Sequence, residues 1–484
     1  MKKVVNILLS SIFVSSLLYA DDFDDEFDSE FGKSDTKQTQ KKSNDDFDED
    51  FDDEFQDQQP KKAKKSYFLS MQGSLKVRGY SFLRPTHYEN RNNSQQQADS
   101  VLELNAKFKK SNYLASASIF SMIGTEHNTY NYGRIFEEFR DTNREVPIGG
   151  IRELYVIDSS DKYDLIIGKK IFKNSVSTLY SPSDVYNITL SPDPLDPYTI
   201  GTWLGDFEYY RDNDSFGVVF FPVISNSKTF SSKSRWSGND DSLQNSNHFI
   251  IPVGATVDED QENKVRMLLK YKGTKTILGM GADFIFNIGY GPSLYTVLEY
   301  TDKTNVYKET HPEAWYISTG FSTTYKKFEV HAEAYYQNVE KSRDDDFISA
   351  VGGASYTLDE WVDKIGVNKV SMVVEYVRET ITKSYDESKT FRSSEQERAP
   401  KNDILVKVDA EINHKWSLNY FGNFRLSIKE QKDSGRYQKI GTTYTIRDGL
   451  VSSLFVEVFN GEENSYYGKW RDNDRIGLQF KYSF

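Results

Sequence analysis

Apolar and polar residues alternate with a period of two over most of the chain from Tyr67 to Phe484. In 102–109, for example, Leu, Leu, Ala and Phe alternate with Glu, Asn, Lys and Lys. This period predicts antiparallel strands with one apolar and one polar face. The polar face carries too many charges for the interior of a sandwich. Lipid outside and water inside would satisfy both faces, so we predict an all-β transmembrane barrel. A secreted β-solenoid or sandwich is the alternative.

Short and long links alternate between the predicted strands. The short links are 109–112, 159–162, 211–214, 272–275, 325–327, 413–415 and 447–449, and the long ones are 85–97, 123–149, 171–199, 225–262, 288–311 and 380–401. Short turns are typical of the periplasmic end of an outer-membrane barrel, and long loops of the outside. The pattern predicts 18 strands, with both termini in the periplasm. Sixteen is the alternative, because the interpretation of 288–311, which contains LYTVLEY, is the weakest.

The predicted strands fall into two sets that run in opposite directions. One set covers 67–82, 113–122, 163–170, 215–224, 276–287, 328–340, 366–379, 416–429 and 450–459. The other covers 98–108, 150–158, 200–210, 263–271, 313–324, 347–357, 402–412, 437–446 and 473–484. A monomer is expected, because about 18 strands can close a lumen without a partner.

The chain divides into three segments of different composition. Residues 1–20 have two lysines followed by a mostly apolar stretch, which predicts a secretory signal peptide. Residues 21–65 contain 17 Asp and Glu but only 8 Lys, with few aliphatic residues, and are predicted to be a disordered acidic tail in the periplasm. Residues 66–484 form the predicted barrel.

The acidic tail contains an internal repeat. DDFDDEFDSEF at 21–31 recurs as DDFDEDFDDEF at 45–55. A spacing of four places three phenylalanines of each copy along one helical stripe, which could fold on docking to a basic groove with apolar pockets. The predicted partner-binding residues are Phe23, Phe27, Phe31, Phe47, Phe51 and Phe55. An acidic spacer is the alternative.

Composition narrows the function. The net charge of −13 argues against nucleic acid as the main partner, and the absence of cysteine removes disulfides, thiolate metal sites and a cysteine nucleophile. The sequence has six histidines, and it contains neither a Gly-x-Ser-x-Gly nor a His-Glu-x-x-His motif. We therefore expect no enzyme, no cofactor and no metal site, with an outer-membrane hydrolase as a remote alternative.

Four of the 12 prolines lie in the long link 171–199, which predicts a rigid loop that folds inward and narrows the pore. The predicted constriction residues are Lys169, Lys170, Asp184, Asn187 and Asp193. An external cap is the alternative. The predicted lumen face carries both charges, on Arg78, Lys107, Lys407, Arg425 and Lys481 and on Glu103, Glu329, Glu333, Asp409 and Glu411, with His331 between two of the glutamates. This mixture leaves ion selectivity open.

Two further features support a barrel of the outer membrane. Phe480, Tyr482 and Phe484 resemble the terminal signal by which the insertion machinery recognises such barrels. The segment 150–224 contains Ile151-Arg152-Glu153-Leu154-Tyr155, Gly168-Lys169-Lys170 and a loop rich in proline and asparagine before Trp203. It resembles a broad family of large Gram-negative outer-membrane barrels of mostly unassigned function, distantly like the alginate-export porins. Lys169-Lys170 stand where that family has arginine and glutamine.

The sequence therefore predicts a channel or export porin for a solute or polymer in the outer membrane of a Gram-negative bacterium. Its outer face would meet lipid, and its tail would recruit a periplasmic or inner-membrane protein. The alternative is an envelope-assembly or export component whose barrel mainly anchors the tail.

Overall fold

The structure is a computed structural model that describes residues 67–484, except for 126–145 and several shorter gaps. These gaps are 88–90, 224, 226, 231–233, 238–242, 246–249, 253–255, 260–264, 278, 302–304, 359–361, 397, 427–433 and 463–464. The predicted signal peptide, the acidic tail and its six phenylalanines lie outside the described residues.

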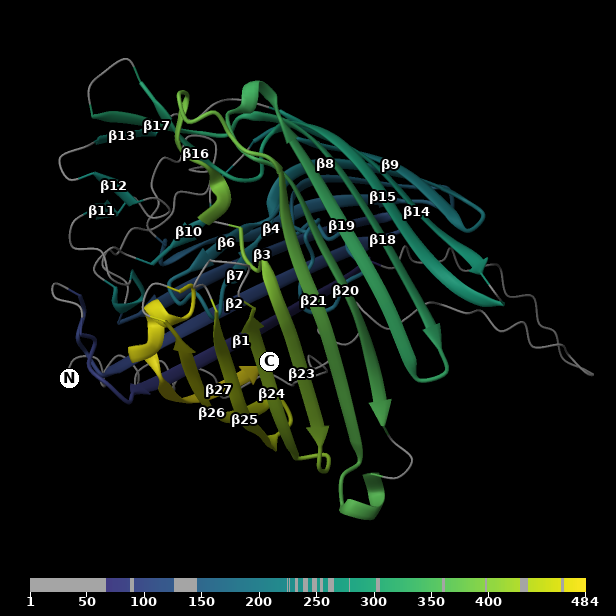
Figure 1. The fold of residues 1–484 in the computed structure, drawn as a ribbon. Coiled ribbons are helices and arrows are strands. Elements are labelled where there is room, and N and C mark those ends of the chain that lie inside the picture. The colour runs from purple at the N-terminus through teal and green to yellow at the C-terminus, as the bar shows by residue number, and fades with distance from the viewer. Residues whose placement is uncertain are drawn as a thin grey trace, which may run out of the picture.

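Eighteen antiparallel strands form a closed barrel, as predicted (Figure 1). Each strand pairs with its neighbour in the chain order of the barrel strands, and the first and last strands pair with each other to close the ring. The barrel strands are β1 (Tyr67–Phe82), β2 (Gln96–Lys110), β3 (Tyr113–Gly124), β4 (Gly149–Ser159), β5 (Tyr163–Lys170), β8 (Thr202–Arg211), β9 (Asp214–Phe221), β14 (Arg266–Ile277), β15 (Met280–Pro292), β18 (Glu313–Tyr325), β19 (Phe328–Val339), β20 (Asp346–Leu358), β21 (Lys369–Lys383), β23 (Asn402–Glu411), β24 (Trp416–Arg425), β25 (Gly435–Arg447), β26 (Leu450–Gly461) and β27 (Arg475–Ser483).

Two details of the predicted strand map are wrong. The turn expected at 272–275 lies further along the chain, because β14 continues to Ile277, which pairs with Met280. Gly279, at a φ of 82°, provides the left-handed backbone conformation that this tight reversal needs. The segment 288–311 does contain two strands, β16 (Val297–Tyr300) and β17 (Val306–Thr310), but both belong to a separate sheet, so the count of 18 is unaffected.

The long links carry most of the remaining elements, which gather at one end of the barrel, on the left in Figure 1, whereas η4 lies at the opposite end, in the link between β20 and β21. We call the opposite end, where short turns join the strands, the short-link end. The added strands are β6 (Ile188–Ser191), β7 (Tyr198–Ile200), β10 (Lys228–Thr229), β11 (Leu243–Asn245), β12 (Ile250–Pro252), β13 (Thr256–Glu259), β16, β17 (Val306–Thr310) and β22 (Thr390–Arg392). The 3-10 helices are η2 (Arg235–Ser237), η3 (Glu340–Ser342), η4 (Val362–Ile365), η5 (Ser394–Gln396) and η6 (Gly468–Asn473). Among the described residues, no helix is long and apolar enough to cross a membrane.

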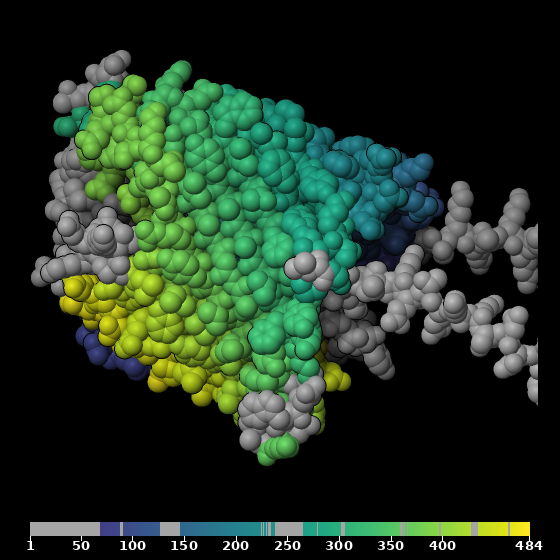
Figure 2. All heavy atoms as spheres, turned by 45° about the vertical axis from the view of Figure 1, so that its right-hand side comes forward, coloured from purple at the N-terminus to yellow at the C-terminus, as the bar shows by residue number. Residues whose placement is uncertain are grey.

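The outer wall is apolar, and the inner face is polar and largely covered. Leu104 and Ile317 are 39% exposed on the outside, whereas their chain neighbours Glu103 and Ser318 are buried inside. This is the predicted alternation, with every second side chain turned to each face. Figure 2 shows the outer wall over the strands of 313–411 as a continuous surface.

Aromatic side chains collect near the short-link end of this wall. The rings of Phe328 and Tyr356 lie 4.2 Å apart, and those of Trp416 and Tyr444 lie 4.5 Å apart. Phe328 and Trp416 are exposed. Aromatic girdles of this kind sit at the level of lipid headgroups, where one part of the ring system is wet and the other apolar.

Candidate functional site

The loop 171–199 contacts inward-facing side chains on opposite sides of the barrel. It leaves the wall after β5, contacts β19 and β21, and returns through β6 and β7 beside β1, β2 and β4. Every residue of this loop lies within the described part of the chain. The position of the loop is set by polar anchors and by apolar packing.

Two buried glutamates on one wall hold the first half of the loop. Glu333 on β19 accepts hydrogen bonds from the amides of 176–177 at 3.0 and 3.4 Å and from the amide of Ser183 at 3.1 Å. Glu375 on β21 accepts from three consecutive amides, 178–180, at 2.8–2.9 Å, and Nε2 of His331 lies 2.9 Å from it. Hydrogen bonds to an ionised carboxylate are stronger than neutral ones. The two side chains therefore fix the backbone of 176–183.

Arginine and lysine side chains on the opposite wall hold the second half. Nη1 of Arg475 on β27 lies 2.6 Å from Oδ2 of Asp193. Nζ of Lys76 on β1 lies 3.0 Å from Asp196, which also pairs with Arg78. Burial disfavours the charged form of Asp196, but Arg78 and Lys76 outweigh this effect and hold the pKa of Asp196 well below its usual range.

A β-bulge supplies a third anchor. The register between β3 and β4 shifts at Arg152, so this residue is the extra one on its strand. Arg152 pairs with Glu103 on β2, donates to the carbonyl of Thr199 at 3.3 Å and lies over the ring of Tyr198. The Tyr198 hydroxyl donates to Glu103 at 2.9 Å. Bulges turn side chains away from regular alternation, and this one brings Arg152 to the loop.

Apolar side chains fill the part of the lumen beyond the loop. Leu179 and Tyr180 pack against a buried cluster on β20, β21 and β23. Phe172 and Tyr186 belong to a second cluster over β8 to β20, in which the Tyr186 and Phe221 rings stack 5.2 Å apart. A cavity remains on the side of the loop that faces β1 to β5 and β27.

This free space is a cavity of about 1320 Å³. Its wall residues come from β1 to β5, β8, β14 and β27, from the loop 171–199 and from the links that follow β9 and β15, and they continue to the rim at Lys469 and Trp470. Four carboxylates line it, those of Glu103, Glu153, Asp184 and Asp196. Eight cationic side chains line it, those of Lys76, Lys107, Arg152, Lys170, Lys173, Arg266, Lys469 and Lys481. The lining therefore carries an excess of positive charge.

The predicted constriction residues divide into two groups. Lys170, Asp184 and Asn187 line the cavity. Asp193 instead faces Arg475 and is 7% exposed, and Lys169 is 1% exposed and donates to the carbonyl of Ile151 at 2.7 Å. Neighbouring residues of a strand point to opposite faces, so Lys169 and Lys170 cannot both face one cavity.

The predicted lumen residues lie on the inner face, and most of them are paired there. Lys407 and Asp409 form an ion pair with a separation of 3.0 Å, and Glu329 accepts from Ser322 and Ser355. Arg78, His331, Glu333 and Arg425 are buried, whereas Lys107 and Lys481 line the cavity. Sequence reasoning missed the anchors Glu375, Arg475, Lys76 and Asp196 and the lumen role of Arg152.

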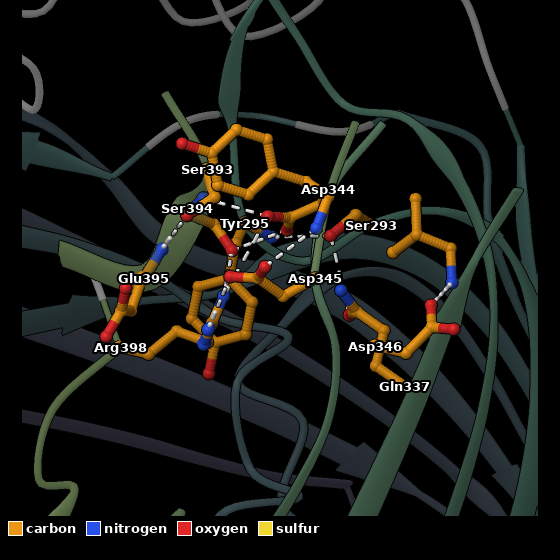
Figure 3. A network of polar contacts seen from close by, with 12 residues as sticks. Ser293, Tyr295, Gln337, Asp344, Asp345, Asp346, Ser393, Ser394, Glu395 and Arg398 are labelled. Carbon is orange, nitrogen blue, oxygen red and sulfur yellow. Dashed lines mark hydrogen bonds and ion pairs between the residues drawn. The ribbon is translucent and has the colours of Figure 1, made fainter. Parts of the chain in front are cut away.

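A second polar network lies at the rim beside the long links (Figure 3). The guanidinium of Arg398 lies 3.2 Å from Asp345, 3.0 Å from Glu379 and 3.9 Å from Asp344. Asp344 accepts from the amide of Ser394 at 2.9 Å. Burial raises the pKa of Asp344 to about 6, against the opposing effects of Arg398 and Ser394. These contacts join the link 340–345 to the link 384–401.

No family model and no curated protein matches the chain. Among solved structures, it is similar to OccK5 (OpdH) of Pseudomonas aeruginosa, with a TM-score of 0.44, 10% identity and coverage of 86% of this chain and 98% of the other. For Pseudomonas aeruginosa OpdK with vanillate, the TM-score is 0.44 and the identity 11%, with coverage of 86% of this chain and 98% of the other. For a loop-deletion mutant of OmpT of Vibrio cholerae, the TM-score is 0.37 and the identity 8%, with coverage of 86% of this chain and 99% of the other. The resemblance to alginate-export porins stays a prediction.

Proposed function

We propose that this protein is an outer-membrane channel for small polar solutes, with a preference for anions. The observation that carries the proposal is the cavity of about 1320 Å³, which runs between the inward-folded loop and the cationic wall. A lumen whose charged residues are mainly lysine and arginine concentrates anions and raises their rate of entry. The loop 171–199 acts as the constriction, with Lys170, Asp184 and Asn187 facing the solute.

Reversal potentials in planar bilayers test this function. With a tenfold gradient of KCl across the bilayer, the purified protein is expected to show stable single-channel steps and a reversal potential of the sign for chloride preference. Arg152→Gln and Lys170→Gln together should shift this potential toward zero. Glu329→Gln, which changes an inner-face residue outside the cavity lining, is the matched control. The absence of conductance, or a cation preference, would overturn the proposal.

The apolar outer wall and its aromatic side chains support an outer-membrane location with lipid as the immediate partner. The short-link end is then periplasmic, which puts both ends of the described chain there. Phe480 and Tyr482 on the outer face of β27, with Phe484 directly after this strand, are proposed as the signal for the insertion machinery. The barrel is proposed to act as a monomer.

The repeated Phe and acid motif favours a second role, recruitment of a periplasmic or inner-membrane protein. The test is a pull-down with a peptide of 21–58 from periplasmic and inner-membrane extracts. Capture that is lost when all six phenylalanines become alanine supports recruitment. If recruitment is retained while the purified barrel conducts nothing, the protein is an envelope-assembly or export component anchored by its barrel.

A further inference from the structure

The outer wall over five neighbouring strands carries almost no charge. On β21, β23, β24, β25 and β26, which lie side by side, the even-numbered residues face outward (Figure 1). These outward positions include no aspartate or glutamate, and their only charged residues are Arg378 on β21 and Arg436 on β25. We call Arg378 and Arg436 the wall arginines. Two cations on a wall without acids need a partner from outside the protein.

The wall satisfies its neutral polar groups but not these two guanidinium groups. The Tyr376 hydroxyl donates to Asn402 at 2.8 Å, and the Gln438 amide donates to the Tyr420 hydroxyl at 2.9 Å. Within the described part of the chain, neither wall arginine forms an ion pair or a side-chain hydrogen bond. Guanidinium has several N–H donors and cannot be neutralised by deprotonation. The wall arginines therefore present a fixed positive charge with open donors.

Both wall arginines lie near the long-link end of the lipid-facing surface. Arg378 pairs with Asn402, the first residue of β23, and Arg436 is the second residue of β25. The rings of Tyr290 and Trp315, 4.7 Å apart, lie toward the same end on β15 and β18. An arginine on the lipid face is costly at the midplane of a bilayer and tolerated near its surface. The long-link end of this wall therefore meets lipid headgroups.

The spacing of the wall arginines suits phosphate groups held at one headgroup level. Three strand steps separate them, and Arg436 pairs with Phe424, two residues from the level of Arg378. Their Cα atoms are then roughly 16 Å apart. Guanidinium binds phosphate through two parallel hydrogen bonds. On the midplane side of the wall arginines, the outward residues Val374 and Ile440 are exposed and apolar. A fitting occupant therefore has phosphate beside an apolar part.

We propose that the wall arginines bind the phosphates of a glycolipid in the outer leaflet of the outer membrane. The acyl chains of this lipid lie against the apolar wall, and its headgroup phosphates accept from Arg378 and Arg436. The inference rests on the proposed outer-membrane orientation and not on conduction. A barrel that conducts nothing would leave it intact, whereas an inverted barrel would overturn the assignment to the outer leaflet.

Native mass spectrometry of the mature chain in a non-ionic detergent tests the binding. The probe is lipid A with two phosphates, compared with the same lipid after removal of both phosphates. We expect the phosphorylated lipid to bind, and the dephosphorylated lipid to bind roughly tenfold more weakly or less, because the charged hydrogen bonds are lost. Inorganic phosphate should not displace the lipid. Equal binding of the two lipids, or displacement by inorganic phosphate, would overturn the proposal.

Variants then assign the binding to the wall arginines. Arg378→Gln with Arg436→Gln should weaken binding of lipid A about as much as removal of its phosphates. Replacement of both by lysine keeps the charge but not the paired donors, so an intermediate loss is expected. Arg211→Gln is the matched control, since Arg211 is exposed on the outer face of β8 at the short-link end. Each variant is checked for the heat-dependent gel shift of a folded barrel. Unchanged binding in the folded double glutamine variant would refute the assignment.

Discussion

Single carboxylates inside the barrel decide where the loop lies. Glu375 is fully buried and accepts from three amides of the loop as well as from His331. A hydrogen bond to a charged group contributes roughly 1.5–3 kcal/mol. We therefore expect Glu375→Gln to raise amide hydrogen exchange in 176–183 by about tenfold or more, because each 1.4 kcal/mol is a factor of ten. Mass spectrometry of peptic fragments measures this rate.

The control for that change is Glu329→Gln. Glu329 lies on the inner face of the same strand as Glu333, but it accepts hydrogen bonds only from serine side chains of the wall among the contacts of the described residues. Exchange in 176–183 should therefore stay as in the unchanged protein. Equal acceleration in both variants would mean that Glu375 has no special part in holding the loop.

The buried Asp344 at the rim predicts a dependence on pH. Its pKa is about 6 when the rim links are joined and near the ordinary value of 3.8 when they are open. A raised carboxyl pKa contributes stability that is fully present below pH 3.8 and is lost as the pH rises to about 6. Hydrogen exchange in 392–396, corrected for intrinsic rates, should show easier opening at pH 7 than at pH 4.5.

Asp344→Asn is the variant that tests this assignment. It removes the titrating group but keeps a side chain able to accept from Ser394. The free energy of opening should therefore lose its slope against pH between pH 4 and 6. Asp386→Asn changes a partly exposed carboxylate of the same link and should leave the slope unchanged. A slope that survives in the Asp344 variant would assign the pH response to another group.

At the scale of elements, the loop 171–199 is the part whose removal should change transport most. It contacts both walls, and its apolar residues fill the space over β20 to β23. Deletion of 178–197 should widen the narrowest passage and raise single-channel conductance by roughly twofold or more. The barrel strands keep their pairing, so a folded variant should retain its heat-dependent shift in gel mobility. Unchanged conductance in a folded variant would remove the loop from the constriction.

The strands could be predicted from the sequence because each one carries its own alternation, which depends on near neighbours alone. The inward loop was also predicted, from the concentration of proline in 171–199. The anchors could not be predicted in this way. Glu375 lies between Val373 and Val377 on the inner face of β21, and only the closure of the ring brings it to the loop. Asp193 looked like a pore residue because its partner Arg475 is distant in the chain.

At the scale of the whole molecule, charge is divided between two walls. The loop is held by glutamates on the side of β19 and β21 and by arginine and lysine on the side of β27 and β1. The glutamates accept from loop amides, whereas the arginine and lysine pair with Asp193 and Asp196 of the loop. The lining of the cavity carries eight lysine and arginine side chains against four carboxylates, so the field in the free space is positive.

The orientation of the barrel determines which end of the cavity opens to the periplasm, and cysteine labelling tests this orientation. Asp161→Cys lies in a short link, Ser388→Cys lies in the long link 384–401, and both positions are exposed in a chain without cysteine. If the short-link end is periplasmic, a membrane-impermeant maleimide should label position 388 on intact cells and position 161 only after the outer membrane is permeabilised. Because β1 starts and β27 finishes at the short-link end, the same result would put both ends of the described chain in the periplasm. Labelling of position 161 on intact cells would invert the barrel and leave the tail outside, where it could not recruit a periplasmic or inner-membrane protein.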